Sequence, residues 1–390
     1  MKRIELGKII APAKVRRAGN TDYPVLSMTM RDGLVNQADK FKKRIASADT
    51  SPYKVVERNQ LVVGFPIDEG VLAFQNLYDE AIVSPAYNIW NVQDDASIDS
   101  QYLELFLRSP SALEFYKSKL RSTTARRRSL PNDIFLLLPV PVPPLAEQER
   151  IVKLLDEADE LRKLRAQADR RTAELIPALF HKIFGDPATN PKRLPVKSLR
   201  ELSEKFSDGP FGSNLKSSHY TESGVRVIRL TNIGVGYMID DNKAYVSPEH
   251  FESLIKHKCL PGDVLVGTLG DPNLRAFILP PEIEMALNKT DCVQIRPKEG
   301  VAISEFICWL VNLPSTLAMA SGMILGQTRS RISMGRLAEL RVPVPPLAMQ
   351  KEFAARVTEI RAVQAEQAAS RLRLENLFQS LLHRAFNGAL

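Results

Sequence analysis

The chain has 390 residues, 44% of them hydrophobic and 25% charged, which is the composition of an ordinary folded protein, so disorder is not expected. This length is enough for two or three domains, each with a core of its own. The net charge of +8 favours a polyanionic partner such as nucleic acid, because Lys and Arg neutralise phosphates.

The three cysteines, Cys259, Cys292 and Cys308, are far apart and form no Cys-x-x-Cys pair, so neither a disulfide framework nor a zinc site is predicted. The first residues lack the apolar core of a signal peptide, and no stretch approaches about 18 consecutive apolar residues. We therefore expect a reduced, cytoplasmic protein with no membrane partner.

The first segment, residues 1–144, is predicted to be a mixed α/β domain. Strand-like runs cover 53–56 and 61–65, and residues 81–90 give two strands around a turn. Helical patterns follow at 100–106 and 111–120.

Residues 145–185 are predicted to form a long amphipathic helix. Its apolar residues recur mostly at steps of three or four, Pro143 and Pro144 precede it, and Gly185 ends it. Pro177 lies inside this helix and is expected to kink its last turns.

Residues 186–346 repeat the style of the first domain, with strands at 225–230 and 264–266 and a helix at 304–311. A second long helix, with a weakly packed middle rich in Ala and Gln, is predicted over residues 347–390.

An internal repeat connects these segments. The string Val-Pro-Val-Pro-Pro-Leu-Ala-Glu-Gln at 140–148 recurs as Val-Pro-Val-Pro-Pro-Leu-Ala-Met-Gln at 342–350, an offset of 202 residues. The same offset continues without a gap to Phe184 and Phe386, so chance recurrence of a proline-rich string does not explain it.

The two long helices, each about 60 Å at 1.5 Å per residue, must bury their apolar stripes. We favour an antiparallel coiled coil of the two over the alternative that each covers its own domain. The predicted core positions are Ile151, Leu154, Leu155, Ala158, Leu161, Phe353, Val357, Ile360, Leu377 and Leu381.

The predicted fold class is therefore α+β with a pseudo-two-fold internal duplication. Two globular α/β domains, 1–144 and 186–346, are separated by two long helices, 145–185 and 347–390, which form the coiled coil.

Polar and basic residues cluster at comparable places in both domains, and Arg, Gln, Ser and Thr are suited to base edges and phosphates. Any single cluster is better explained as solvated surface, and only the matching places of the two clusters bring DNA contact level with that explanation. The same two explanations apply to the turn-rich loop at 208–213. The candidate DNA-binding residues are Lys42, Lys43, Arg44, Arg126, Arg127, Arg128, Ser213, Lys216, Arg229, Asn232, Gln327, Thr328, Arg329 and Arg331.

Motifs of catalysis are missing from the sequence. There is no His-Glu-x-x-His, no Gly-x-Ser-x-Gly and no Gly-x-Gly-x-x-Gly after a strand, and no catalytic or metal-binding residue is predicted. Asp263 follows Gly262 in a strand context, as in some nucleases, but no Glu-x-Lys comes after it. The duplicated His181 and His383 lie near helix ends, where a capping role is favoured.

The proline string that opens a long helix, present twice and each time after a globular domain, resembles the specificity subunit of type I restriction-modification enzymes. Segments 23–27, 84–87, 208–212, 228–233 and 261–265 resemble its target-recognition domains. The first domain departs from the pattern because it lacks a clear counterpart of 208–213, and Met349 stands where the first copy has Glu147.

The resemblance implies a non-catalytic subunit whose two domains each read one half of a bipartite, asymmetric site in double-stranded DNA. The helices would set the unread spacer, and a rod of about 60 Å corresponds to about 17 base pairs. It also implies two modification subunits that methylate adenine and restriction subunits that act as motor and nuclease. S-adenosylmethionine, ATP and Mg are expected on those partners, and no cofactor is expected in this chain.

Two other functions are weighed against this one. The first is a stand-alone DNA-binding regulator or adaptor without a methyltransferase partner. The second is a self-contained methyltransferase or nuclease, against which the missing motifs count. Copurification separates them, because only a specificity subunit brings a methyltransferase with it.

Overall fold

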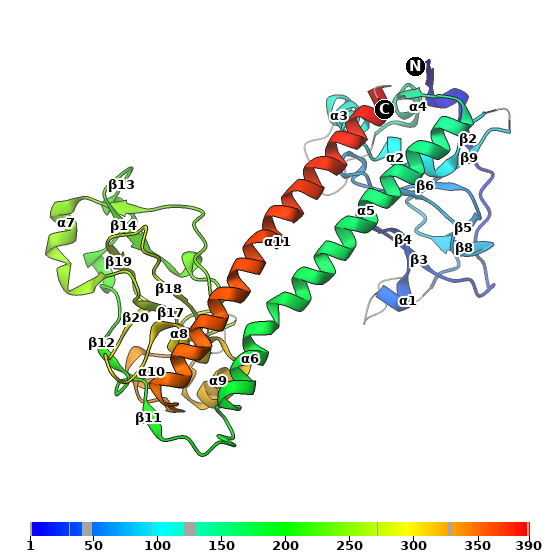
Figure 1. Cartoon of the computed structure of the whole chain (residues 1–390). Coiled ribbons are helices and arrows are strands. Elements are labelled where there is room, and N and C mark those ends of the chain that lie inside the picture. Colours follow the sequence, from blue (N-terminus) through cyan, green and yellow to red (C-terminus); the bar gives the residue numbers. More distant parts are fainter. Residues whose placement is uncertain are drawn as a thin grey trace. The chain divides into compact units, whose positions relative to one another are not determined.

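A computed structural model of the chain (Figure 1) describes residues 2–30, 32–40, 49–94, 96–120, 130–270, 272–326, 330–387 and 390. The chain divides into two compact units. The first comprises Met1–Ala166 and Ala369–Leu390, and the second comprises Gln167–Ala368. Each unit combines a globular part with segments of the long helices.

The first unit has a core sheet of four antiparallel strands. Two further antiparallel pairs, β3–β4 and β5–β8, share buried apolar residues with this sheet. The predicted strands and helices of this region are all present. The strands are β2 (Ile10–Pro12), β9 (Asn88–Val92), β6 (Leu61–Val63), β7 (Leu72–Phe74), β3 (Leu26–Thr29), β4 (Gly33–Asn36), β5 (Lys54–Glu57) and β8 (Glu80–Val83), and the helices are α1 (Gln37–Lys40), α2 (Ser100–Leu107), α3 (Pro110–Lys119) and α4 (Asn132–Leu136).

The second unit also has a four-stranded antiparallel sheet, in the order β12-β20-β17-β18. A separate five-stranded sheet, β13-β15-β14-β19-β16, contains one parallel pair, β14–β19. The strands are β12 (Ser203–Ser207), β20 (Cys292–Pro297), β17 (Val264–Gly267), β18 (Arg275–Ile278), β13 (Tyr220–Thr221), β15 (Tyr245–Val246), β14 (Val225–Ile228), β19 (Ala286–Asn288) and β16 (Lys258–Cys259), and the helices are α7 (Pro248–Ser253), α8 (Ser304–Asn312), α9 (Pro314–Ala320) and α10 (Met334–Ala338).

The proline string closes each globular part in the same way. In the first unit β1 (Arg3–Glu5) pairs antiparallel with β10 (Pro139–Pro141), which lies in the string. In the second unit β11 (Val196–Ser198) pairs antiparallel with β21 (Arg341–Pro343), in the equivalent register. Proline is compatible with such short two-stranded pairs, because its nitrogen can face away from the partner strand. The repeat seen in the sequence is therefore also a repeat of topology.

A duplicated glutamine anchors each long helix to its globular part. Gln148, fully buried, accepts a hydrogen bond from Asp99 N–H (2.8 Å) and donates to the carbonyls of Ser97 (2.9 Å) and Pro143 (2.8 Å). Such a side chain satisfies backbone groups that would otherwise be buried without partners.

Gln350 makes the equivalent bonds in the second unit. It is fully buried, accepts from Ile303 N–H (3.0 Å) and donates to the carbonyls of Val301 (3.0 Å) and Pro345 (2.8 Å). Each glutamine thus ties the first turn of a long helix to the loop that precedes α2 or α8.

The first long helix is interrupted shortly before Pro177, in the last turns, where the sequence predicts a kink. Helix α5 runs from Leu145 to Ala173, and α6 runs from Leu175 to Phe184. The break at Glu174 precedes Pro177, so this proline occupies the first turn of α6, where the missing N–H has no helical partner to lose. Gly185 ends α6 with a φ of 84°. The second long helix, α11, is continuous from Leu347 to Asn387.

Within each unit, the segments of the two long helices pair antiparallel, as predicted (Figure 1). In the first unit Arg162 of α5 forms an ion pair with Glu375 of α11 at 2.8 Å. In the second unit the hydroxyl of Thr172 accepts from Gln367 Nε2 at 3.0 Å, and the rings of Phe180 and Phe353 are 5.5 Å apart. As the residue number rises along α5 and α6, the number of the contacting residue in α11 falls, which is the pattern of an antiparallel pair.

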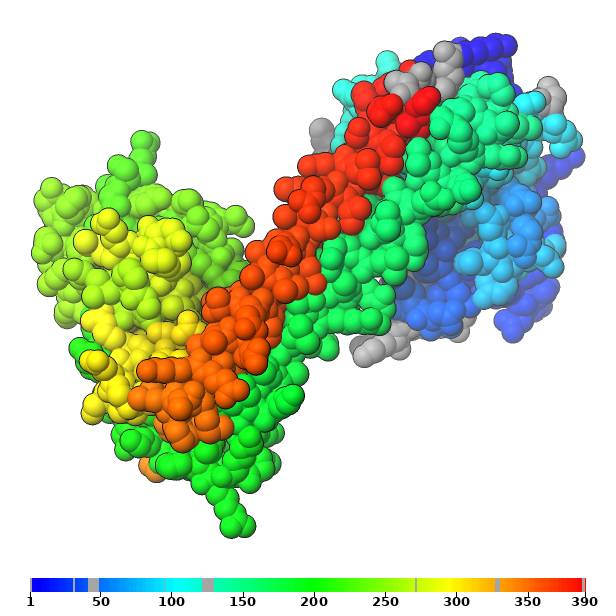
Figure 2. Space-filling view, viewed as in Figure 1, coloured from blue at the N-terminus to red at the C-terminus, as the bar shows by residue number. Residues whose placement is uncertain are grey.

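The ends of the helical pair are built into the two globular cores. Figure 2 shows the last turns of α11, in red, alongside the first turns of α5 in the first unit. There Phe386 packs edge-on against Tyr102 and Phe106, with ring centroids 5.5 and 5.2 Å apart. In the second unit Phe353 packs against Phe184, the repeat counterpart of Phe386, at 5.2 Å.

The predicted core of the helical pair needs correction at two positions. Ile151, Leu155, Ala158, Phe353 and Val357 are buried, and Leu154, Ile360 and Leu381 are partly buried. By contrast, Leu161 and Leu377 are 51% and 48% exposed.

The physical reason is that Arg162, not Leu161, continues the buried stripe of Ile151, Leu155 and Ala158. Its guanidinium lies 4.2 Å from the ring centroid of Phe378, so this part of the helical contact is polar and aromatic.

In the part of the chain that the structure describes, no single helix is long and apolar enough to cross a bilayer. The consecutive segments Ser304–Asn312 and Pro314–Met323 are long and apolar enough when taken together, but they are bent by 72° relative to each other.

Candidate nucleic-acid interface

The turn between β19 and β20 is the centre of the candidate interface in the second unit. The buried carboxylate of Asp208 accepts from the N–H groups of Gly209 (2.8 Å) and Asp291 (2.9 Å). A side chain at position 209 would lie 2.2 Å from the backbone of Lys289, so only glycine fits there. Thr290 donates from its hydroxyl to the Pro210 carbonyl at 2.5 Å. The loop at 208–213 is therefore attached to this turn at three points.

Burial raises the pKa of Asp208, and the nearby Asp291 carboxylate adds to this effect. The N–H groups of Gly209 and Asp291 oppose it by binding the charged form. The Asp208 carbonyl accepts from His257 Nδ1 at 2.7 Å, and burial lowers the pKa of that histidine. Both residues therefore help to hold the loop in place.

The segment that contains Arg331 joins the same turn. Leu325 and Arg331 exchange backbone hydrogen bonds of 2.8 Å, and Gly270 N–H donates to the Ser330 carbonyl at 3.1 Å. The guanidinium of Arg331 forms an ion pair with Asp291 at 2.6 Å while its side chain stays 44% exposed. The structure thus brings Arg331 to the loop at 208–213, more than 100 residues earlier in the chain.

A second group of cations surrounds Tyr220. Lys289 donates to the Tyr220 hydroxyl at 3.0 Å, and its ammonium lies 5.3 Å from the ring centroid. The guanidinium of Arg229 lies 5.8 Å from the same centroid and also donates to the Asn242 carbonyl. Ser213 and Lys216 are exposed on the neighbouring loop. Such a group of cations, amides and hydroxyls is suited to binding phosphate oxygens.

Asn232 was predicted to contact DNA, and the structure contradicts this. The side chain is fully buried, accepts from Arg229 N–H at 3.0 Å and donates to the carbonyls of Ile239 (3.0 Å) and Asp241 (3.2 Å). An asparagine whose amide is used in this way shapes the loop and cannot reach a base.

Other candidates lie outside the described residues. They are Lys42, Lys43, Arg44, Arg126, Arg127, Arg128, Gln327, Thr328 and Arg329.

Sequence reasoning missed Lys289, Thr290 and Tyr220. A signal was present, because the polar string Asn288-Lys289-Thr290-Asp291 separates two apolar strands. Its position beside the loop at 208–213 depends on the antiparallel pairing of β12 with β20, which the local pattern does not reveal.

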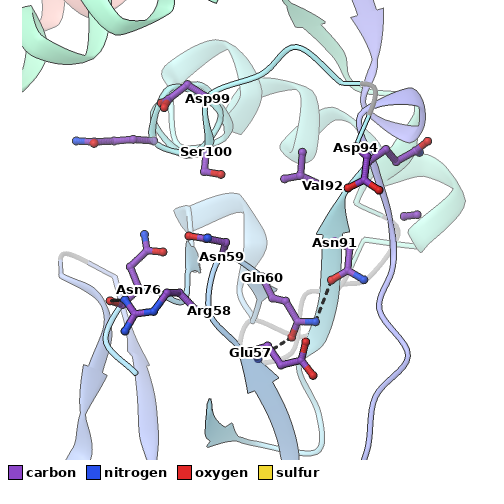
Figure 3. A pocket seen from close by; sticks show the side chains of 13 residues that line it. Glu57, Arg58, Asn59, Gln60, Asn76, Asn91, Val92, Asp94, Asp99 and Ser100 are labelled. Atoms are coloured by element: carbon purple, nitrogen blue, oxygen red, sulfur yellow. Dashed lines mark hydrogen bonds between the residues drawn. The ribbon is translucent and has the colours of Figure 1, made fainter. Parts of the chain in front are cut away.

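One hollow of the first unit has a different chemistry (Figure 3). It is open to solvent and lined by carboxylates and amides, including Glu57, Asn59, Asn76 and Asp94. Its arginine, Arg58, is already paired with Asp79 at 3.1 Å. This lining disfavours a phosphate, so the hollow does not extend the candidate interface.

Asp263 and two of the cysteines, residue types that can act in catalysis, are buried in the fold. The buried Asp263 accepts from Leu260 N–H, from Gln294 and twice from Arg296, at 2.6 to 2.8 Å. Burial raises the pKa of Cys259 and of Cys308 to about 12, so both thiols are protonated at neutral pH. The described residues contain no group of three or more His, Cys, Asp or Glu that could hold a metal.

No family model matches the chain, but specificity subunits of type I restriction enzymes are similar to it in sequence. The specificity subunit of the type I restriction enzyme MjaVIII from Methanocaldococcus jannaschii is 22% identical over 87% of this chain and 79% of that protein. The EcoKI specificity subunit from Escherichia coli K12 is 25% identical over 70% of this chain, and the match spans 63% of that protein.

Two solved structures share the fold over nearly the whole chain. One, from a study of complex assembly and conformational transition in the type I R-M system, has a TM-score of 0.67 at 18% identity and covers 100% of this chain and 98% of its own. The other, a type I S subunit from M. genitalium, has a TM-score of 0.53 at 16% identity, with 99% and 96% covered. The resemblance to type I specificity subunits and the predicted fold class are confirmed.

Proposed function

We propose that this chain is the DNA-recognition subunit of a type I restriction-modification complex, and that it is not itself a catalyst. Each globular part would read one half of a bipartite, asymmetric site in double-stranded DNA. The helical pair would set the spacer and dock two modification subunits together with restriction subunits.

The observation that carries this proposal is a repeated scaffold with dissimilar additions. Both globular parts are closed by the proline string, anchored by a glutamine and built on a four-stranded antiparallel sheet. Beside that sheet the first unit has two strand pairs, whereas the second has a five-stranded sheet. A common scaffold that presents two different surfaces is what recognition of two different half-sites requires.

The cations around the turn at 288–291 support DNA as the ligand of the second unit. Lys289 and Arg229 lie around one tyrosine, and Lys216 and Arg331 belong to the two segments attached to this turn. Phosphate contacts of this kind position a protein on the duplex, while the base edges supply specificity.

Partner subunits would supply the chemistry. S-adenosylmethionine would be held by the modification subunits, and ATP and Mg by the restriction subunits, in the cytoplasm. The exposed Leu161, Leu164 and Leu372 of the helical pair, at 51%, 51% and 63%, support docking of proteins on the helices.

The test is to express the full chain with its candidate modification subunit and to map adenine methylation by single-molecule sequencing. A split motif that appears only when this chain is present, together with copurification of the two proteins, is the expected result. A chain that binds DNA but brings no methyltransferase would favour the stand-alone regulator or adaptor. Absence of new methylation with an active, bound partner would contradict the proposal.

A further inference from the structure

Phe211 is exposed in a way that sets it apart from the other phenylalanines. Its side chain is 57% exposed, whereas every other phenylalanine in the described part of the chain is buried or partly buried. An aromatic ring without a polar group gains nothing from water, so its position at a loop tip points to a ligand.

The loop that carries Phe211 is held firmly on both sides. On one side Asp208 and Gly209 are fixed to the turn at 288–291, and the Pro210 carbonyl accepts from Thr290. On the other side Leu215 is buried, only 3% exposed, in an apolar cluster with Val227 and Phe251. Residues 211–214 between these anchors are all exposed. The ring is therefore presented by a fixed loop and not by a loose one.

The surroundings of this loop favour nucleic acid over an apolar protein surface. The carboxylates next to the loop are already used, because Asp208 binds two N–H groups and Asp291 is paired with Arg331. Lys216 lies on the loop itself, and Lys289 lies in the turn to which the loop is attached. Proteins that insert an apolar side chain into a base step commonly hold the DNA backbone with nearby cations, and this loop offers both kinds of residue.

We propose that Phe211 is a wedge that inserts between neighbouring base pairs in the half-site read by the second unit. The ring would unstack one base step while Lys216 and Lys289 bind the adjacent phosphates. Specificity would then depend partly on how easily that step opens, because pyrimidine–purine steps deform with least cost. This inference rests on the proposed function, since it needs the chain to bind a DNA site.

The experiment uses the full chain bound to its modification subunit and duplexes that contain the methylated motif. 2-Aminopurine is placed in turn at each position of the half-site, because its fluorescence rises when it is unstacked. We expect a rise at one step with the unchanged protein and with Phe211→Trp. Phe211→Ala should abolish the rise and weaken binding about 10- to 100-fold.

Tyr237→Ala provides the matched control, because Tyr237 is 62% exposed in the same unit and lies outside this loop. It should leave both the fluorescence and the affinity unchanged. Since Phe211 is exposed, Phe211→Ala should also leave the melting temperature unchanged, so a loss of binding would not reflect unfolding.

Two results would overturn the wedge. One is a Phe211→Ala complex that keeps the affinity and the fluorescence rise. The other is loss of the modification subunit while DNA binding is kept, which would make Phe211 a protein contact. If the unchanged complex bound no duplex specifically, the proposed function would fail, and this outcome is distinct from both.

Discussion

At the scale of single residues, the ion pair of Asp263 and Arg296 shows how a sequence feature that suggests chemistry can serve the fold. The Asp263 side chain is 2% exposed and that of Arg296 is 25% exposed, and two hydrogen bonds of 2.8 Å join them. Asp263 lies in the turn directly before β17 and Arg296 lies in β20, so the pair joins these two neighbouring strands. The carboxylate has no capacity left for a metal or a substrate.

We expect Asp263→Ala to lower the free energy of unfolding of the second unit by about 3 kcal/mol, because Arg296 and Gln294 lose a buried acceptor. Denaturant unfolding followed by tryptophan fluorescence measures this change in a Trp90→Phe background, in which Trp309 is the only tryptophan of the sequence. Glu339→Ala is the control, because its pair with Arg200 is exposed and should contribute less than about 1 kcal/mol. Equal effects of the two variants would refute the structural role.

The cations of the candidate interface give a second prediction. Lys289→Ala should weaken DNA binding and reduce the slope of log K against log salt by about one, because one phosphate contact is lost. Lys298→Ala is the matched control, since Lys298 is exposed and follows the opposite end of β20. Titrations at several salt concentrations measure both slopes. An unchanged slope for Lys289→Ala would remove this lysine from the interface.

At the scale of elements, the glutamine anchors predict a matched pair of effects. Gln148→Ala and Gln350→Ala should each lower the free energy of unfolding by about 2 to 3 kcal/mol, because three hydrogen bonds to buried backbone groups are lost. Each effect should be confined to the unit that contains the glutamine.

Tryptophan fluorescence distinguishes the units, because Trp90 lies in the first and Trp309 in the second. Gln379→Ala, which removes only an exposed bond to Glu375 within α11, is expected to change stability little. If Gln148→Ala lowered the free energy of unfolding and Gln350→Ala did not, the two copies of the anchor would not contribute equally to stability.

The elements that could be predicted are those with local signals. The long helices follow from apolar spacing, and the ends at Pro144 and Gly185 follow from residues that stop or start helices. Leu161 was misplaced because it is adjacent to the true stripe, which Arg162 continues with an aromatic contact instead of a leucine.

The candidate interface was predicted only in part, since its assembly is non-local. Ser213, Lys216, Arg229 and Arg331 were identified from residue type, but the turn at 288–291 that organises them was not. Asn232 was misassigned because its buried bonds to Ile239 and Asp241 depend on a loop closure that residue type alone does not indicate.

At the scale of the whole molecule, the repeat separates what must be constant from what must differ. The constant parts are the proline string, the glutamine anchor and the helix that follows, which recur at a fixed offset. The different parts are the strands added beside each four-stranded sheet. Under the proposed function, the first set would govern spacing and assembly, and the second set would govern which bases are read.

A matched deletion in both helices tests this division. Removing residues 163–169 from α5 and 368–374 from α11 keeps the contacts Arg162–Glu375 and Thr172–Gln367, which lie on either side of the deleted segments. Each helix loses about 10 Å, so the spacer of the methylated motif should shorten by about three base pairs. The two half-sites should stay the same, because neither globular part is altered.

Methylation mapping measures the spacer and both half-sites in one experiment. Deleting 163–169 alone is the control, since it places Arg162 and Thr172 out of register with α11 and should abolish methylation. A matched deletion that changed a half-site sequence would mean that the helices take part in base reading. A spacer of unchanged length would mean that the helices do not set the distance between the half-sites, and the division of roles within the repeat would then be wrong.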